Sequence, residues 1–271
     1  MCIIINTRIR KLRKKEKFLG KKEFYMSEIL MDEAERRQFN EFKRKMSLQA
    51  AQAQIKKIEY NLTEATLDRA TLRRACQDAA LLKLGAVCVL PCMVKQCRAT
   101  LGLQSQVLII ACVSFPHGGD SLKTKVAAVK NAVKDGADEV EVTAPISSIK
   151  DGNWSYVKRE FKKMKRAAKK CAVRINVEYS LLTTQELTRV CNVAADCGIT
   201  SLRTSSGSYA GGFNSDVISV MKSAVKDKCT IKADAVVNIT EMNMAVDMGA
   251  GIIGSKNASD LGRMIMQAAE E

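Results

Sequence analysis

Histidine, proline and tryptophan are scarce in this chain of 271 residues: it has one His, three Pro and one Trp, and aromatic residues make up 5% of it. It also has no apolar run of about 18 residues or more, the length that a membrane-spanning helix needs, so we expect no transmembrane segment. No clean apolar stretch follows the basic N-terminus, so we expect no secretory signal. With few prolines and an apolar share of 46%, the sequence indicates a globular protein, as one barrel or two small domains.

Ten cysteines are present, but they form no CxxC pair, and the single histidine is His117. Most of them lie inside apolar segments without the regular spacing of small secreted domains, which indicates buried thiols in a reducing cytosol. Cys88, Cys92 and Cys97 are close in sequence, yet they lack the ligand spacing of a zinc site. We therefore predict a cytoplasmic protein without a metal site.

The net charge of +15 is concentrated at the N-terminus, where residues 1–25 carry nine Lys or Arg against two Glu. Two interpretations of this basic arm stay open. It binds RNA or anionic lipid, or it results from the choice of start site, with translation beginning at Met26 instead of Met1. A purine-only Lys-Glu pair two codons ahead of Met26 favours the second interpretation. Because the arm has no nucleic-acid motif, we do not expect nucleic-acid binding as the primary role.

A repeating pattern of secondary structure follows the arm. Residues 26–57 lack glycine and proline and predict a polar amphipathic helix. Beyond them, short apolar runs alternate with helical patterns, which is typical of βα units around a parallel sheet. The expected strands are Ile58–Leu62, Ala86–Leu90, Val107–Val113, Glu139–Ala144, Val173–Glu178, Ile199–Thr204, Thr230–Asp234 and Gly251–Gly254. The expected helices occupy residues 67–83, 92–101, 121–135, 154–171, 184–197, 215–227, 240–248 and 259–270.

Eight strands alternating with eight helices match a (βα)₈ TIM barrel better than an open doubly wound sheet, since no GxGxxG follows the first strand. We predict an α/β protein with this barrel at residues 58–271, an extra helical segment at 26–57 and the basic arm at 1–25. The expected helix N-caps are Thr66, Ser121, Thr183 or Thr184, Asn214 and Thr240. The expected helix-stopping glycines are Gly85, Gly136, Gly198 and Gly249.

Polar residues converge on the predicted barrel interior. Successive side chains of a strand point to opposite faces, so if Val140 and Val142 face the helices, Glu141 points inward. The same alternation directs polar groups of five strands inward: Glu59, Asn61, Glu141, Thr143, Arg174, Asn176, Glu178, Arg203 and Lys232. Apolar branched residues normally fill this space, so the pattern indicates an active site at the C-terminal ends of the strands. The alternative is a self-neutralising ion network with a structural role only, made of Glu141, Glu178, Arg174, Arg203 and Lys232.

Residues 58–260 resemble the deoxyribose-phosphate aldolases, class I aldolases with a TIM barrel. The matching segments are Gly85–Pro91, Ser114–Gly118, Gly136–Val142, Val177-Glu178 with Leu181–Thr183, Leu202–Gly207 and Ile231-Lys232. This family cleaves 2-deoxyribose 5-phosphate reversibly to glyceraldehyde 3-phosphate and acetaldehyde through a lysine Schiff base. The resemblance thus implies a lyase of deoxyribonucleotide catabolism that acts on a small phosphorylated sugar or aldehyde. It also implies a homodimer as a plausible assembly, and no cofactor, because an imine is its own electron sink.

The family's catalytic residues carry over with one major departure. The resemblance places its second lysine at Lys232 and its proton-moving aspartate at Glu141, while the Schiff-base position holds Arg203. A guanidinium stays protonated and cannot form an imine. We therefore predict that Lys232 forms the imine, that Arg203 lowers its pKa, and that Glu141 moves protons. The substrate-binding residues that the resemblance implies are Glu59, Cys88, Glu178, Thr204, Ser206, Gly207, Gly254 and Ser255.

Other departures weaken the expected phosphate site. Ala235-Val236 stand where the family has two glycines, which hinders a close backbone approach to phosphate. Many members have Asp-His-Thr on the first strand, where this chain has Glu59-Tyr60-Asn61, and a lysine at the position of Ser208. The alternative to an active lyase is therefore a catalytically silent paralogue that binds a small ligand or a protein partner. His117, in a segment shared with the family, is interpreted as a structural hydrogen-bonding residue.

Overall fold

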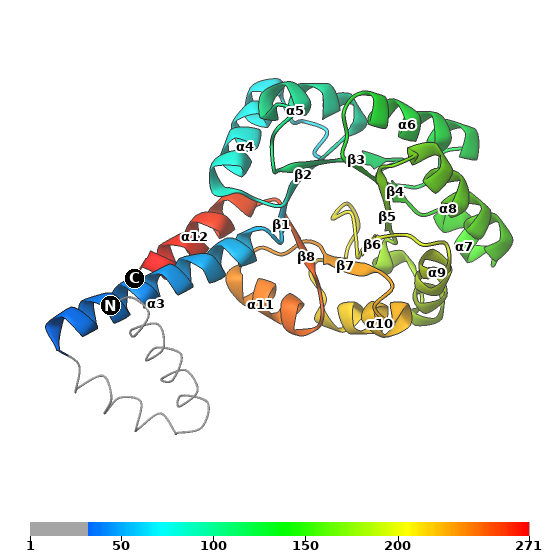
Figure 1. The fold of residues 1–271 in the computed structure, drawn as a ribbon. Coiled ribbons are helices and arrows are strands. Elements are labelled where there is room, and N and C mark those ends of the chain that lie inside the picture. Colours follow the sequence, from blue (N-terminus) through cyan, green and yellow to red (C-terminus); the bar gives the residue numbers. More distant parts are fainter. Residues whose placement is uncertain (1–31, 271) are drawn as a thin grey trace. The chain divides into compact units, whose positions relative to one another are not determined.

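A closed barrel of eight parallel strands organises the chain, as Figure 1 shows for the computed structural model, which describes residues 32–270. Each strand pairs with the next along the chain, and the last pairs with the first. The strands are β1 (Ile58–Leu62), β2 (Ala86–Val89), β3 (Leu108–Val113), β4 (Glu139–Thr143), β5 (Ala172–Asn176), β6 (Ser201–Arg203), β7 (Thr230–Ala233) and β8 (Ile252–Ser255). The predicted α/β TIM barrel is confirmed.

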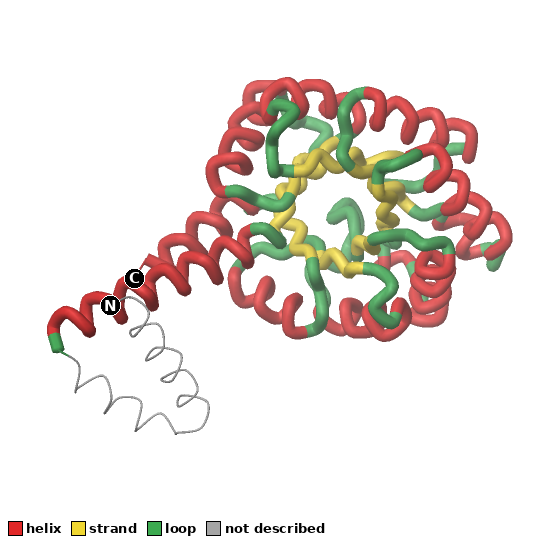
Figure 2. Tube along the Cα trace, in the orientation of Figure 1, coloured by secondary structure: helices red, strands yellow, loops and turns green. Residues whose placement is uncertain are grey.

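Helices surround the ring of strands, as Figure 2 shows in red around yellow. The helices of the described chain are α3 (Glu33–Ile55), α4 (Arg69–Leu82), α5 (Val94–Leu101), α6 (Leu122–Lys134), α7 (Ile146–Lys150), α8 (Trp154–Ala168), α9 (Thr184–Asp196), α10 (Ser215–Val225), α11 (Ile239–Asp247) and α12 (Ala258–Glu270). Two 3₁₀ turns, η1 (Pro91–Met93) and η2 (Tyr179–Leu181), follow β2 and β5. Neither α7 nor these turns could be expected from the sequence, because such short segments carry little periodic signal.

Side-chain caps fix where several helices begin. The predicted caps Ser121, Thr183 and Asn214 each accept a hydrogen bond from a backbone N–H of the first turn. The predicted caps Thr66 and Thr240 were wrong: Asp68 caps α4 and Asn238 caps α11. Asp and Asn are better N-caps than Thr because their side-chain oxygens reach the free N–H groups more readily.

Glycine closes three of the four expected helix ends. Gly136, Gly198 and Gly249 all have positive φ angles. At the fourth end, α4 closes on Lys83, which has a φ of 59°, and not on Gly85. Gly85 serves a different purpose, because a Cβ there would lie 2.3 Å from the carbonyl oxygen of Lys56. The chain therefore needs glycine at that position for a close backbone approach.

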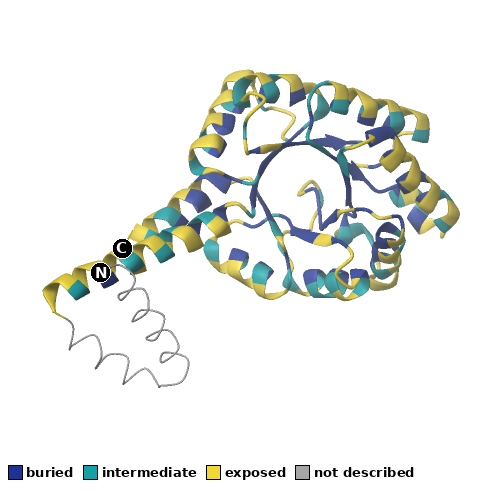
Figure 3. Cartoon of the chain, viewed as in Figure 1, coloured by how far each residue is buried: buried dark blue, intermediate teal, exposed yellow. Residues whose placement is uncertain are grey.

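The barrel places its apolar core between strands and helices. Val140 and Val142 are fully buried in this layer. Figure 3 shows the same division, with buried strands inside and exposed outer helix faces. A second, small apolar cluster of Ala86, Cys88, Ile110 and Cys112 belongs to β2 and β3. The inward charged groups come from other strands, so the barrel interior has an apolar side and a charged side.

The chain divides into two compact units, and the boundary lies between Ala50 and Ala51, inside α3. In the first unit, exposed ion pairs join side chains one helical turn apart, such as Lys45 with Glu41 at 2.7 Å. The predicted basic arm at residues 1–25 and the alternative start at Met26 lie outside the described residues. None of the helices in the described part combines the length and apolar character that a membrane crossing needs.

Candidate active site

Strand register brings the predicted catalytic side chains together inside the barrel. Arg203 and Lys232 are register partners on the paired strands β6 and β7. Glu141, on β4, reaches both of them, with its two carboxylate oxygens 2.7 Å from Arg203 Nη1 and 3.7 Å from Lys232 Nζ. Arg203 ends β6, Lys232 lies one residue before the end of β7 and Glu141 lies in the middle of β4, and all three residues are at most 1% exposed. The inward directions expected from strand alternation therefore hold at these positions.

Arg203 is held by several acceptors. Its Nη1 donates to Glu141 Oε1, its Nε forms an ion pair with Asp234 and donates to the Ser205 carbonyl oxygen at 2.6 Å, and its guanidinium lies 5.4 Å from the centre of the Phe115 ring. Burial disfavours the charged guanidinium, but Asp234 and Glu141 outweigh burial and raise the pKa of Arg203. This side chain thus anchors the neighbouring acids and cannot act as a nucleophile.

Lys232 is fully buried among polar partners. Its Nζ lies 2.8 Å from Glu59 Oε2 and 3.7 Å from Glu141 Oε2. It also donates to Asn61 Oδ1 at 3.3 Å and to Cys88 Sγ at 3.1 Å. The three shorter contacts, with Glu59, Asn61 and Cys88, match the three N–H groups of an ammonium, and Glu141 adds a longer ion pair.

The charge state of Lys232 differs from the sequence prediction. Burial lowers its pKa and Arg203 acts in the same direction, as expected, but Cys88, Glu141 and Glu59 outweigh both, so the pKa is raised. The effect of Arg203 is thus in the predicted direction, but the sequence analysis did not count the groups that contact the same nitrogen and raise the pKa of Lys232. In the resting protein, Lys232 is an ammonium.

The acids around these cations are ionised. Burial opposes the charge of Glu59, yet Lys232 and Arg174 lower its pKa to about 2. Glu141 also has a lowered pKa, because Lys232 and Arg203 outweigh its burial. Arg174 extends the network: its Nη1 lies 2.6 Å from Glu59 and its Nε 2.5 Å from Glu139. Paired charges of this kind are costly to break singly, because one partner is left buried and unpaired.

Glu178 does not join this ion network, contrary to the structural interpretation of the sequence pattern. Its carboxylate accepts hydrogen bonds from Asn176 Nδ2 at 3.1 Å and from the backbone N–H of Ser206 at 2.9 Å. Asp234 takes the expected place of Glu178 as an acid in the network. Alternation two residues after Lys232 could have identified Asp234, whereas nothing in the sequence pointed to the Ser205 carbonyl.

The other predicted binding residues lie around this centre. Glu59 and Cys88 both contact Lys232 inside the barrel. Thr204, directly after β6, accepts a hydrogen bond from the backbone N–H of Asp234 at 3.0 Å. Gly254 lies so close to the site that a Cβ there would be 2.8 Å from Lys232 Cε. These four residues therefore lie beside Lys232 or Asp234 and form part of the surroundings of the charged network.

The remaining predicted substrate-binding residues, Ser206, Gly207 and Ser255, lie at the end of β8 or shortly after β6. The Ser206 hydroxyl accepts from the backbone N–H of Ser208 at 3.0 Å. The Ser255 hydroxyl donates to the Val236 carbonyl at 2.5 Å and accepts from the Asn257 N–H. Gly207 is exposed, with a φ of 76°. Both hydroxyls are thus engaged in internal hydrogen bonds, and their role in substrate binding stays a prediction.

Two more features of this face bear on the sequence analysis. Ala235, at the position of a family glycine, has a φ of 59°, so the backbone keeps a glycine-like conformation despite the added Cβ. His117 Nδ1 lies 2.6 Å from Tyr209 Oη, which joins the segment after β3 to the segment after β6. The residues of this hydrogen bond are distinct from those around Lys232.

The fold and this interior define the class of the protein, a TIM barrel with paired charges buried among its strands. Residues 43–270 match the family described as DeoC/LacD family aldolase. The chain belongs to this aldolase family. It is 30% identical over 203 residues to a deoxyribose-phosphate aldolase of Finegoldia magna, covering 74% of this chain and 95% of that protein. It is 31% identical over 204 residues to that of Caldicellulosiruptor saccharolyticus, covering 74% and 92%.

Solved structures share the fold. The aldolase QR15 matches with a TM-score of 0.75 at 22% identity, covering 79% of this chain and 96% of that chain. The deoxyribose phosphate aldolase of Aeropyrum pernix, described as a tetramer, matches with a TM-score of 0.72 at 18% identity, covering 83% and 97%. At these identities the likeness establishes the fold alone.

Proposed function

We propose that this chain is a deoxyribose-phosphate aldolase-like lyase in which Lys232 forms the Schiff base. It would cleave 2-deoxyribose 5-phosphate, or a related small aldol, reversibly to glyceraldehyde 3-phosphate and acetaldehyde. The observation that carries the proposal is the place of Lys232, which is the only lysine on the eight strands of the described chain and lies beside Glu59 and Glu141. An amine that forms an imine must have neighbours that exchange protons with it.

The reaction begins with deprotonation of Lys232. Its proton leaves to solvent as the pH rises, and the free amine, held beside Glu59, adds to the substrate carbonyl. Loss of water leaves a protonated imine, which takes up the electron pair of the breaking carbon–carbon bond as an enamine. Glu141 accepts the proton of the hydroxyl that becomes the departing aldehyde. Protonation of the enamine and addition of water then release acetaldehyde and restore the amine.

Arg203 supports these steps without forming a covalent bond. Its contact with Glu141 lowers the pKa of that carboxyl, so Glu141 is ionised and ready to accept a proton. The same acids hold Lys232 as an ammonium, so imine formation is slow at neutral pH. We therefore propose a lyase whose rate rises with pH.

One observation favours a second candidate function, a silent paralogue that binds a small carbonyl or anionic ligand without turnover. The Schiff-base position of the family holds Arg203, and the remaining amine has a raised pKa. Both cations are then structural partners of buried acids. The two candidates predict different fates for a bound sugar phosphate, because only the first makes a covalent bond to it.

Turnover of 2-deoxyribose 5-phosphate between pH 7 and pH 10 distinguishes the candidates. The lyase predicts acetaldehyde release that increases with pH and is lost in Lys232→Met. Lys228→Met is the matched control, because Lys228 precedes β7 on the surface and, among the described residues, pairs only with Asp196 at 3.5 Å. Thermal stabilisation by the sugar phosphate without acetaldehyde at any pH supports the silent paralogue. Loss of activity in Lys228→Met would contradict the assignment of the amine.

We also propose a cytoplasmic role in deoxyribonucleotide catabolism, as the resemblance implies. Its substrate would be a small phosphorylated sugar or aldehyde, and a homodimer stays a prediction.

A further inference from the structure

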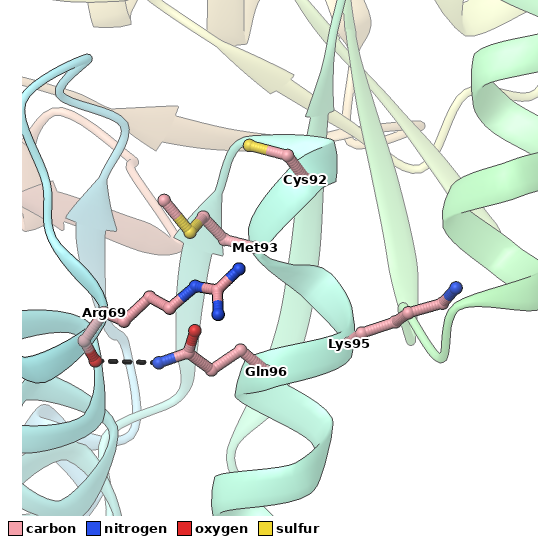
Figure 4. A pocket seen from close by; sticks show the side chains of 5 residues that line it. All are labelled: Arg69, Cys92, Met93, Lys95 and Gln96. Atoms are coloured by element: carbon pink, nitrogen blue, oxygen red, sulfur yellow. Dashed lines mark hydrogen bonds between the residues drawn. The ribbon is translucent and has the colours of Figure 1, made fainter.

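A cavity lies outside the barrel interior, between two neighbouring βα units. It has a volume of about 550 Å³ and is lined by Arg69, Cys92, Met93, Lys95 and Gln96 (Figure 4). Arg69 begins α4, which follows β1, and Cys92 and Met93 belong to η1, which follows β2. The cavity therefore lies on the carboxyl side of the barrel, within the size range of small-molecule sites.

Arg69 brings an uncompensated charge to this cavity. Within residues 32–270, its exposed guanidinium has no hydrogen bond or ion pair, and only its backbone carbonyl is engaged, by Gln96 Nε2 at 2.7 Å. Figure 4 shows the guanidinium on the same side as the Met93 and Gln96 side chains. Lys95 points away from them in this view, and its Nζ lies 3.3 Å from Asp135. Arg69 is thus the cation available to a ligand.

We propose that this cavity binds a small organic oxyanion, a carboxylate or phosphate monoester with an apolar group. The planar guanidinium of Arg69 presents parallel N–H donors that match two oxygens of either anion. Met93 supplies a polarisable apolar wall for the rest of the ligand. The Gln96 amide, tied to the backbone of Arg69, holds α4 and α5 together beside the site. The ligand would touch none of the residues of the imine chemistry, so this inference does not rest on the proposed function.

Cys92 provides a direct readout of occupancy because its thiol lines the cavity and is exposed. Neutral iodoacetamide alkylates the full-length chain carrying Cys2→Ser, which removes a cysteine outside the described residues. Trypsin then releases Leu84–Lys95, a peptide that contains both Cys92 and the fully buried Cys88. Cys88 reports any loss of the fold, and fragmentation of the peptide separates the two labels.

The probes are benzoate, phenyl phosphate and inorganic phosphate, at matched ionic strength so that charge screening stays constant. At ten times the dissociation constant of an organic anion, about nine tenths of the sites are filled, so alkylation of Cys92 falls about tenfold. The two organic anions show whether carboxylate or phosphate is preferred. Inorganic phosphate, which lacks the apolar group, should bind at least about tenfold more weakly, a difference of about 1.4 kcal/mol.

Paired variants make the test specific. Arg69→Gln should abolish protection of Cys92, whereas Arg73→Gln, one turn further along the same helix and outside the cavity lining, should retain it. Lys95→Gln should also retain it, read from the longer tryptic peptide Leu84–Arg98 that this variant gives. No protection by either organic anion, equal protection in Arg69→Gln, or equal affinity for inorganic phosphate would overturn the proposal. Labelling of Cys88 stays low in every variant that is folded.

Discussion

Lys232 and Glu59 form a buried ion pair in which Nζ and Oε2 lie 2.8 Å apart, in the centre of the charged side of the barrel. The pair couples the reactivity of the amine to the charge of the acid. The pKa of Glu59 is about 2, so its carboxyl group is ionised at neutral pH. This negative charge helps to raise the pKa of Lys232. Glu59 therefore keeps Lys232, the only lysine on the eight strands of the described chain, in its protonated and unreactive form.

Removing the charge of Glu59 should activate Lys232. In Glu59→Gln, the ammonium loses an anionic partner, so its pKa falls and the free amine forms at lower pH. We expect the pH–rate profile of acetaldehyde release to shift toward neutral pH by at least one unit, which corresponds to about 1.4 kcal/mol. Glu139→Gln is the control, since Glu139 contacts Arg174 and makes no ion pair with Lys232 among the described residues. An unchanged profile in Glu59→Gln would contradict this coupling.

The same pair predicts how stability depends on pH. The pKa of Glu59 is 4.5 in its unperturbed state and about 2 in the folded protein, so its contribution is present above pH 4.5 and is lost as the pH falls toward 2. This difference corresponds to about 3 kcal/mol. Urea unfolding between pH 7 and pH 2.5 should show the loss. The loss should be smaller in Glu59→Gln, which has no carboxyl to protonate; an identical slope would refute the assignment.

Arg203→Lys should restore an amine at the family's Schiff-base position. The new amine would lie next to Lys232, whose positive charge favours its neutral form. We expect the rate of acetaldehyde release at neutral pH to rise at least about tenfold. Arg174→Lys makes the same chemical change elsewhere in the network, and we expect no such gain there. Equal rates in wild type and Arg203→Lys would show that the surroundings, and not the missing amine, limit turnover.

A buried pair outside the active site should matter for stability alone. Lys125 Nζ lies 2.7 Å from Glu160 and donates to the Thr143 carbonyl at 3.0 Å, and both side chains are at most 1% exposed. Lys125→Met leaves Glu160 buried without its cation, so we expect a loss of about 3–5 kcal/mol in unfolding free energy. Lys150→Met, which breaks the exposed pair with Glu186, should have little effect. Similar losses in both variants would contradict the importance of burial.

Strand alternation predicted much of the fold and the inward residues. Its period of two is a local property, so the sequence alone directs Glu141, Arg203 and Lys232 inward. The protonation of Lys232 could not be predicted in this way, because it depends on distances to Glu59 and Glu141 across the closed barrel. The ion pair between Asp234 and Arg203 could not be predicted for the same reason, because it depends on how two different strands are placed in space.

Features built by two segments together were also beyond the sequence. The cavity at Arg69 forms only where the connection after β1 lies beside the connection after β2. The choice of Asp68 over Thr66 as the cap of α4 is a local competition between two acceptable residues, which a pattern alone does not decide. Longer periodic segments, such as α8 and α9, were predicted to within a few residues at their ends.

Borohydride reduction in the presence of 2-deoxyribose 5-phosphate at pH 9.5, followed by peptide mapping, tests the central claim most directly. A Schiff base would be fixed as a stable secondary amine on the lysine that formed it. The account predicts a two-carbon adduct from acetaldehyde, or the intact sugar adduct, on Lys232, with much less at pH 7. A fully reduced sample with no modification of Lys232 at either pH, while a deoxyribose-phosphate aldolase labelled in parallel is modified, would contradict it.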